Sequence, residues 1–191
     1  LADELVRLKV DVIIAAALFE TRAVKSATKS IPIVFFSSLD PVESGLVDSL
    51  ARPGGNLTGF SNFQNLLTGK RLEILKESIP KLLRVAVLRA SQGSMEQWQE
   101  NQVAAKALRL QLHSMEVGSA DMFEIAFKEA IKAHSTALSV TGNALITSNL
   151  SRVVELAAKY RLPAMYPRAD FVESGGLMSY GADFMEPYKR V

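Results

Sequence analysis

The chain has 191 residues, a length that fits one domain or two small ones and excludes a large multidomain enzyme. It has 22 Lys and Arg against 20 Asp and Glu, a net charge of +2 with no block of like charge, so no nucleic-acid partner is expected. Hydrophobic residues make up 48% of the chain, which argues for a buried core, and the absence of cysteine excludes disulfides and thiol chemistry.

Each end of the sequence resembles part of a helix that is incomplete. The chain begins with Leu1 rather than Met, and residues 1–8 look like the tail of an amphipathic helix. Residues 183–191 resemble the opening of another helix. We therefore expect the sequence to be the middle of a longer protein, with any targeting signal outside it. The longest uncharged apolar run, 12–19, is too short to cross a bilayer.

Eight short apolar segments are predicted to be strands. They are rich in Val, Ile, Leu and Ala without alternation, as expected for parallel strands buried on both faces. Their ranges are 10–16, 31–37, 56–60, 84–89, 110–117, 137–140, 162–166 and 176–180.

Helical patterns separate most of these segments. The predicted ranges are 18–29, 66–79, 95–108, 122–133 and 150–160. In the last of them, apolar residues at 150, 153, 154, 157 and 158 form one stripe. A further helix start is predicted at Asp40, because an Asp cap is followed by Pro41 at the first helical position and Glu43 three residues after the cap.

This alternation predicts an α/β fold with a doubly wound parallel sheet. In such sheets, ligands bind beyond the carboxyl ends of the strands. Motifs for other chemistry are missing. Gly69-Lys70 lacks the rest of a phosphate-binding loop, the two histidines, His113 and His134, have no partner ligands at metal spacing, and no nucleophile elbow occurs.

Small polar residues follow the predicted strands instead. They are Ser37, Ser38, Ser91, Ser94, Thr141 and Asn143, with Asp40 adding one negative charge. Each could simply cap the next helix, but together they would line one edge of the sheet. Such a lining orients a ligand and supplies no nucleophile, base or metal ligand, so it favours binding over catalysis and implies no cofactor.

Several motifs resemble the solute-binding proteins of ABC importers, in the branch that includes tryptophan/tyrosine-type binding proteins. The motifs are Asp40-Pro41, Gly45-Leu46-Val47, Arg52-Pro53-Gly54-Gly55-Asn56-Leu57-Thr58-Gly59, Lys70-Arg71-Leu72-Glu73-Ile74-Leu75 and Gly175-Gly176-Leu177-Met178-Ser179-Tyr180-Gly181. The resemblance covers nearly the whole chain. It implies a type I periplasmic binding protein with two Rossmann-like lobes of parallel sheets flanked by helices.

On this template, residues 1–62 are a partial N-terminal lobe, 63–178 the second lobe, and 179–191 the return to the first. The resemblance implies a cleft in which loops at Leu18, 38–40 and Asn62 face those at 91–94, 141–143 and 166–168.

The resemblance also implies roles for single residues in that cleft. The helix beginning at Ser94 would receive a ligand carboxylate, and Arg168 would pair with it. Tyr166 or Phe19 would stack on a ring.

One departure from the family bears on the ligand. Relatives that bind amino acids tend to have an acidic side chain after the third strand of the second lobe, where it neutralises an ammonium group. Residues 140–144 here read Val-Thr-Gly-Asn-Ala, without charge. A neutral molecule or a small aromatic or short-chain carboxylate therefore competes with a free amino acid as the expected ligand.

We expect a non-enzymatic, periplasmic or extracytoplasmic component of an ABC import system that delivers a small molecule to permease subunits. The membrane would be reached only through the permease or a removed lipid anchor. The main alternative is a ligand-sensing effector domain of a regulator on the same fold. A third interpretation, a racemase-like or decarboxylase-like enzyme, would need a matched acid and base across the cleft.

Overall fold

A computed structural model describes residues 1–16, 18–37, 40–61, 63, 67–92 and 95–182. These divide into two compact units, with the first ending at Phe63. The three-part division expected from the sequence, with boundaries after residues 62 and 178, stays a prediction.

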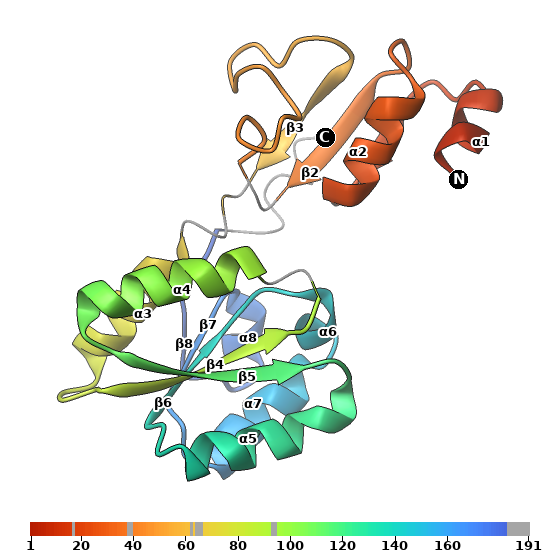
Figure 1. Cartoon of the computed structure of the whole chain (residues 1–191). Helices are drawn as coiled ribbons and strands as arrows, with labels where there is room; N and C mark the ends of the chain where they lie inside the picture. The colour runs from red at the N-terminus through yellow and green to blue at the C-terminus, as the bar shows by residue number, and fades with distance from the viewer. Residues whose placement is uncertain (17, 38–39, 62, 64–66, 93–94, 183–191) are drawn as a thin grey trace. The chain divides into compact units, whose positions relative to one another are not determined.

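The first unit is a small parallel sheet with helices packed on it (Figure 1). Its elements are α1 (Ala2–Arg7), β1 (Ile13–Ala15), α2 (Leu18–Ala27), β2 (Ile33–Ser37) and β3 (Leu57–Ser61). The strands lie in the order β1-β2-β3, and α2 packs against β1 and β2. Apolar side chains from the strands, α2 and the segment before β3 form its core, with Ile33 and Phe35 at the centre of the sheet.

The prediction that a helix starts at Asp40 is wrong. Asp40 does act as a cap, because its Oδ1 accepts hydrogen bonds from the backbone N–H groups of Val42 (2.8 Å) and Glu43 (3.2 Å). However, residues 41–45 form only consecutive turns. Gly45 has φ +70°, a left-handed conformation that ends the helical geometry after one turn. The chain then continues to β3 without a helix.

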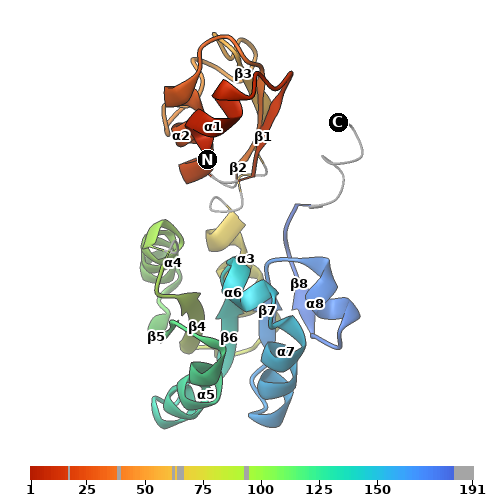
Figure 2. The same ribbon diagram turned by 90° about the vertical axis from the view of Figure 1, so that its right-hand side faces the viewer.

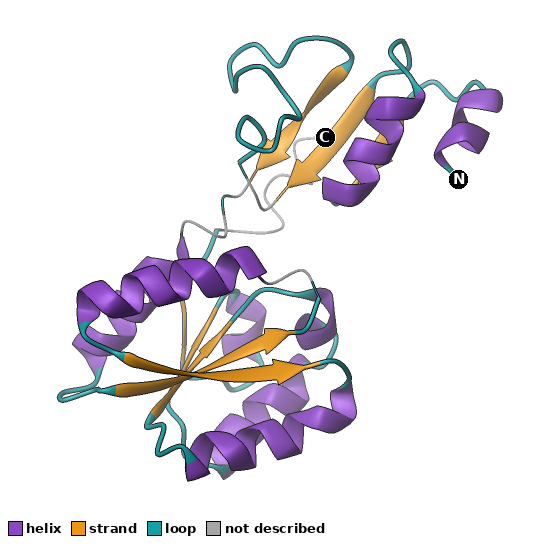
Figure 3. Ribbon diagram, viewed as in Figure 1, coloured by secondary structure: helices purple, strands orange, loops and turns teal. Residues whose placement is uncertain are grey.

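The second unit is a five-stranded parallel sheet with helices on both faces (Figures 1 and 3). Its strands are β4 (Arg84–Ala90), β5 (Gln111–Val117), β6 (Ala137–Val140), β7 (Ala164–Tyr166) and β8 (Met178–Ser179). Its helices are α3 (Leu67–Ser78), α4 (Met95–Leu108), the 3-10 turn η1 (Ala120–Met122), α5 (Phe123–Lys132), α6 (Ala144–Thr147), α7 (Leu150–Lys159) and α8 (Ala169–Glu173).

The sheet of the second unit is covered on both faces, and residues 85–88 of β4 form an uninterrupted, fully buried apolar run. In β4, Val85 packs in a cluster with α3 and α4, whereas Ala86 and Leu88 pack in a second cluster with α5 and α7. Successive side chains of a strand point to opposite faces, so an uninterrupted apolar run requires two covering layers. Figure 2 shows α7 and α8 beside β7 and β8, where α8 contacts both strands.

The apolar stripe of α7 differs from the prediction at two positions, 156 and 158. Val153, Val154 and Ala157 are buried as expected, but Leu156 completes the buried face and Ala158 is exposed. Leu156 lies three residues after Val153 and therefore shares its face of the helix, and its side chain is larger than that of Ala158.

Candidate functional site

The carboxyl edge of the five-stranded sheet contains a break in strand order. The order is β5-β4-β6-β7-β8, so the chain moves to one side of β4 to form β5 and to the other side to form β6. Loops leaving β4 and β6 therefore diverge at the edge where β4, β5 and β6 end. This divergence is where open α/β sheets bind ligands.

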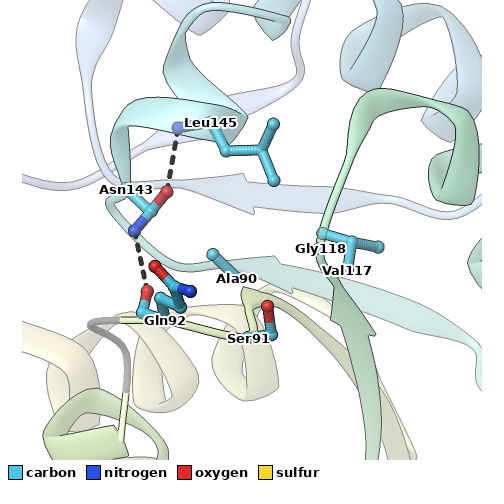
Figure 4. Close-up of a pocket in the computed structure, with 7 residues that line it drawn as sticks. All are labelled: Ala90, Ser91, Gln92, Val117, Gly118, Asn143 and Leu145. Carbon is cyan, nitrogen blue, oxygen red and sulfur yellow. Dashed lines mark hydrogen bonds between the residues drawn. The ribbon is translucent and has the colours of Figure 1, made fainter.

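A cavity of about 250 Å³ lies at this edge (Figure 4). Its lining comes from the ends of β4 and β5 and from the start of α6. The residues are Ala90, Ser91, Gln92, Val117, Gly118, Asn143 and Leu145. The volume is near the lower end for small-molecule sites, and the lining combines apolar side chains with a few polar groups. Of the residues predicted from the sequence, the structure brings Ser91 and Asn143 together here.

Asn143 connects two loops of the cavity wall. It is the N-cap of α6, with extended backbone (φ −156°, ψ 150°), and its Oδ1 accepts a hydrogen bond from the N–H of Leu145 at 2.8 Å. Its Nδ2 donates to the carbonyl oxygen of Gln92 at 3.1 Å. Figure 4 shows both bonds from the one amide. Asn143 therefore combines the predicted capping role with a place in the cavity lining.

Ser91 extends the sheet into the cavity. Its backbone N–H donates to the carbonyl oxygen of Val117 at 2.9 Å, which continues the pairing of β4 with β5 beyond the last strand residue. A Cβ atom added to Gly118 would lie 3.4 Å from the Ser91 hydroxyl oxygen. The absence of a side chain at Gly118 thus leaves space beside this hydroxyl.

Arg89, the residue before the cavity residue Ala90, points away from the cavity. Arg89 forms an ion pair with Glu116, its register partner on β5, and donates to the Ser114 hydroxyl at 2.8 Å. Its guanidinium lies 5.4 Å from the ring centroid of Trp98 on α4. Because side chains alternate along a strand, Ala90 points to the opposite face. The seven lining residues are uncharged.

Thr141 is a structural residue of the strand end. It is buried, and both its N–H and its hydroxyl donate to the carbonyl oxygen of Leu88, at 3.0 and 2.9 Å. It lies outside the cavity lining, so its role is to fix the exit of β6 against β4.

Tyr166 is a core residue. Its side chain is 1% exposed and stacks on Phe171, with ring centroids 4.9 Å apart. Burial raises the pKa of its phenol to about 12. The ring is fully used in packing, so this placement corrects the expectation that Tyr166 stacks on a ligand. Phe19, the other ring considered, is exposed at the start of α2.

Arg168 follows β7 and is paired within its own turn. Its Nε and Nη2 donate to the two carboxylate oxygens of Asp170 at 3.2 and 2.6 Å, in a two-point contact typical of Arg with a carboxylate. Its backbone is the N-cap of α8. The positive charge expected to meet a ligand is therefore balanced by a neighbouring carboxylate.

In the first unit, the predicted residues lie at the ends of strands. Ser37 is the last residue of β2 and is buried beside Ser61, its register partner at the end of β3. Asp40 caps the turn that follows, as described above. The remaining predicted residues, Ser38, Asn62 and Ser94, lie outside the described residues.

Sequence reasoning missed Val117, Gly118 and Leu145 as cavity residues and included Gln92 only as part of the loop 91–94. Gly118 comes directly after the predicted strand 110–117, so its chain position held the signal. Gln92 contributes a backbone carbonyl and Gly118 contributes space, and residue type reveals neither. Within the described ranges, no three His, Asp or Glu side chains gather as a metal ion would require.

No helix in the described part of the chain is both long and apolar enough to span a bilayer.

Parallel sheets flanked by helices, with a cavity beyond the strand ends, are the architecture of periplasmic binding proteins, whose solved structures this chain matches. The sequence matches the family model described as ABC transporter substrate binding protein over residues 1–187. The chain belongs to this family, which confirms the resemblance found in its motifs.

Similar proteins agree with this assignment. A tyrosine-binding protein of Clostridioides difficile (strain R20291) is 30% identical over 187 residues, covering 96% of this chain and 53% of that protein. The chain thus spans about half the length of this curated relative.

Solved structures share the fold. A conserved domain protein of Vibrio cholerae O1 biovar El Tor superposes with a TM-score of 0.82 at 24% identity, covering 97% of this chain and 62% of that one. An ABC domain from Streptococcus pneumonia, solved with L-Trp, gives a TM-score of 0.76 at 26% identity, with coverages of 95% and 63%.

Proposed function

We propose that this chain is part of the solute-binding component of an ABC import system and captures a small organic ligand. The observation that carries the proposal is the cavity at the switch point of the second unit, with an uncharged lining that offers a serine hydroxyl, an asparagine amide and apolar surface. These groups orient a small molecule without providing an acid–base pair or a nucleophile with its base. The proposal includes no enzymatic activity. The expected capture between two lobes stays a prediction.

The proposed ligand class is an aromatic amino acid or a related aromatic carboxylate. The printed names of two relatives, a tyrosine-binding protein and a domain solved with L-Trp, support aromatic amino acids. The uncharged segment 140–144 and the uncharged cavity lining offer no carboxylate to an ammonium group. The ammonium group is therefore proposed to contribute less to the affinity than the carboxylate, to which the serine hydroxyl and the asparagine amide of the lining can donate hydrogen bonds.

The proposed role in transport implies protein partners and a cellular location. ABC permease subunits are the proposed protein partners, and an extracytoplasmic location is proposed because a solute-binding component collects its ligand outside the membrane. The family match favours this function over the sensing alternative.

A thermal-shift comparison tests the ligand class. We expect L-tyrosine, L-tryptophan and 4-hydroxybenzoate to raise the melting temperature and tyramine, which lacks a carboxylate, to leave it unchanged. A ligand at about 100 times its Kd stabilises the native state by about 2.7 kcal/mol, or about 5–10 °C for a chain of this size. If tyramine alone stabilised the protein, the carboxylate would not be the recognised group. If none of the four did, the proposed ligand class would be wrong.

Filling the cavity should abolish this stabilisation. The substitution Gly118→Leu adds a four-carbon side chain beside Ser91, in a cavity of about 250 Å³. We expect a loss of affinity of about 30-fold or more, measured by calorimetry with the ligand that gives the largest shift. Gly118→Ala, whose Cβ meets the Ser91 hydroxyl oxygen at 3.4 Å, should give a smaller loss. Unchanged affinity in Gly118→Leu would place the ligand elsewhere.

A further inference from the structure

Gln97 is a buried polar residue of α4 that pairs with a loop of the cavity wall. Its side chain is 6% exposed. Its Nε2 donates to the carbonyl oxygen of Gly142 at 3.1 Å, and the N–H of Gly142 donates to Oε1 of the same amide at 3.1 Å. The side chain thus pairs with one residue in both directions, as a neighbouring strand would. A primary amide can do this because it carries a donor and an acceptor side by side.

The backbone of Gln97 accepts a further hydrogen bond from a side chain of its own helix. Asn101, one turn further along α4 and 0% exposed, donates from Nδ2 to the backbone carbonyl oxygen of Gln97 at 2.8 Å. Buried polar groups retain their geometry when they are hydrogen-bonded, because breaking the bond inside the protein leaves an unsatisfied group. The buried amide of Gln97, with both of its polar groups paired to Gly142, therefore holds the loop after β6.

Three consecutive residues after β6 are held by three different parts of the unit. Thr141 is bonded to Leu88 within β4, Gly142 to Gln97 on α4, and Asn143 to Gln92 in the loop after β4. Two of these, Gln92 and Asn143, line the cavity. Gln97 does not line it, and its effect on the cavity passes through the backbone of Gly142.

Packing in the core does not require a hydrogen-bonding side chain at position 97. A leucine would fill a buried position on α4 without needing any hydrogen bond, whereas burying an amide is unfavourable unless both of its polar groups are paired. The partners here are the backbone N–H and carbonyl groups of Gly142, which are present whatever side chain the loop has at this position. Removing the Gln97 amide leaves both polar groups of Gly142 without this partner.

The geometry points to Gln97 as a positioning residue of the binding cavity: by holding Gly142 from both sides, it fixes the Asn143 amide in the cavity wall and thereby sets ligand affinity without touching the ligand. This inference rests on the proposed function for its effect on binding. The holding of Gly142 can be measured without any ligand.

The test compares Gln97→Leu and Gln97→Glu with Gln99→Leu, a control on an exposed position of the same helix. With L-tyrosine and L-tryptophan as probes, we expect about a 10-fold loss of affinity for Gln97→Leu and none for the control. In Gln97→Glu, the ionised carboxylate still accepts from the Gly142 N–H but cannot donate to its carbonyl. Affinity should be low at pH 8 and recover as the introduced carboxyl is protonated, because the neutral acid donates again. The parent should show no such recovery over the same pH range.

Amide hydrogen exchange supplies the readout that needs no ligand. The Gly142 N–H should exchange faster in Gln97→Leu than in the parent or in Gln99→Leu. Equal exchange at Gly142 would overturn the inference, as would parental affinity in Gln97→Leu together with faster exchange, since positioning would then have no effect on binding. If the parent binds neither probe, the proposed ligand class fails, and exchange at Gly142 still decides whether Gln97 holds the loop. Gln97→Glu preserves side-chain size in case Gln97→Leu does not fold.

Discussion

The substitution Gly59→Ala is expected to disrupt the sheet of the first unit. Gly59 lies in β3 opposite Phe35 of β2, and a Cβ atom at this position would lie 2.0 Å from the backbone oxygen of Phe35. Backbone atoms cannot move aside as the end of a flexible side chain can, so β2 and β3 must separate locally and lose pairing. We expect a loss of at least about 3 kcal/mol in the free energy of unfolding, at the upper end of overpacking effects.

Hydrogen exchange and denaturant unfolding measure this change. Amides of 57–61 should lose protection while those of β4 and β5 in the second unit retain it. The matched control is Gly69→Ala on α3, where the new Cβ meets only the Ala104 methyl at an ordinary 3.4 Å. Alanine is favoured over glycine inside a helix by roughly 1 kcal/mol, so this variant should be unchanged or more stable. Parental stability in Gly59→Ala would show that the two strands adjust without losing their pairing.

The α/β fold was predictable because its main signals are local. Strands buried on both faces must be uninterrupted apolar runs, and each observed strand overlaps a predicted one. The helix Met95–Leu108 has the predicted bounds. The short helices α6 and α8 were not predicted, since they have too few residues to show a helical period. The turn after Asp40 was mistaken for a helix because its cap is genuine and only Gly45 stops it.

The candidate site was predictable only as an edge of the sheet. Ser91 and Asn143 were found because polar residues after parallel strands meet at that edge. Tyr166 is also at a strand end, but alternation along the strand turns its ring into the core. Gln97 lies inside the predicted helix 95–108, and its contact with Gly142 gave no signal of its own, because that partner is distant in sequence. Contacts between distant residues depend on packing angles that residue type does not specify.

Arg71 contacts the segment that follows β8, and its replacement should be strongly destabilising. Its side chain is 2% exposed on α3, and its Nε donates to the carbonyl oxygen of Tyr180 at 2.7 Å. Burial lowers the pKa of its guanidinium to about 10. Tyr180 follows β8, and its own N–H donates to the carbonyl oxygen of Tyr166. Arg71 therefore attaches the residues leaving the last strand to the first helix of the unit.

The substitution Arg71→Ala should lower the free energy of unfolding by about 2–4 kcal/mol, because it leaves a void at a buried side chain and removes the charge-assisted hydrogen bond to the Tyr180 carbonyl oxygen. Lys70→Ala is the control. Lys70 pairs with Glu73 at 2.9 Å on the exposed side of the same helix, where such pairs contribute at most about 1 kcal/mol. Exchange of the Tyr180 N–H should accelerate in Arg71→Ala and not in Lys70→Ala. Arg71→Met separates the two causes, since it fills most of the volume without the hydrogen bond. If Arg71→Met kept both the stability and the Tyr180 protection of the parent, the attachment would be a matter of packing and the guanidinium would not be needed.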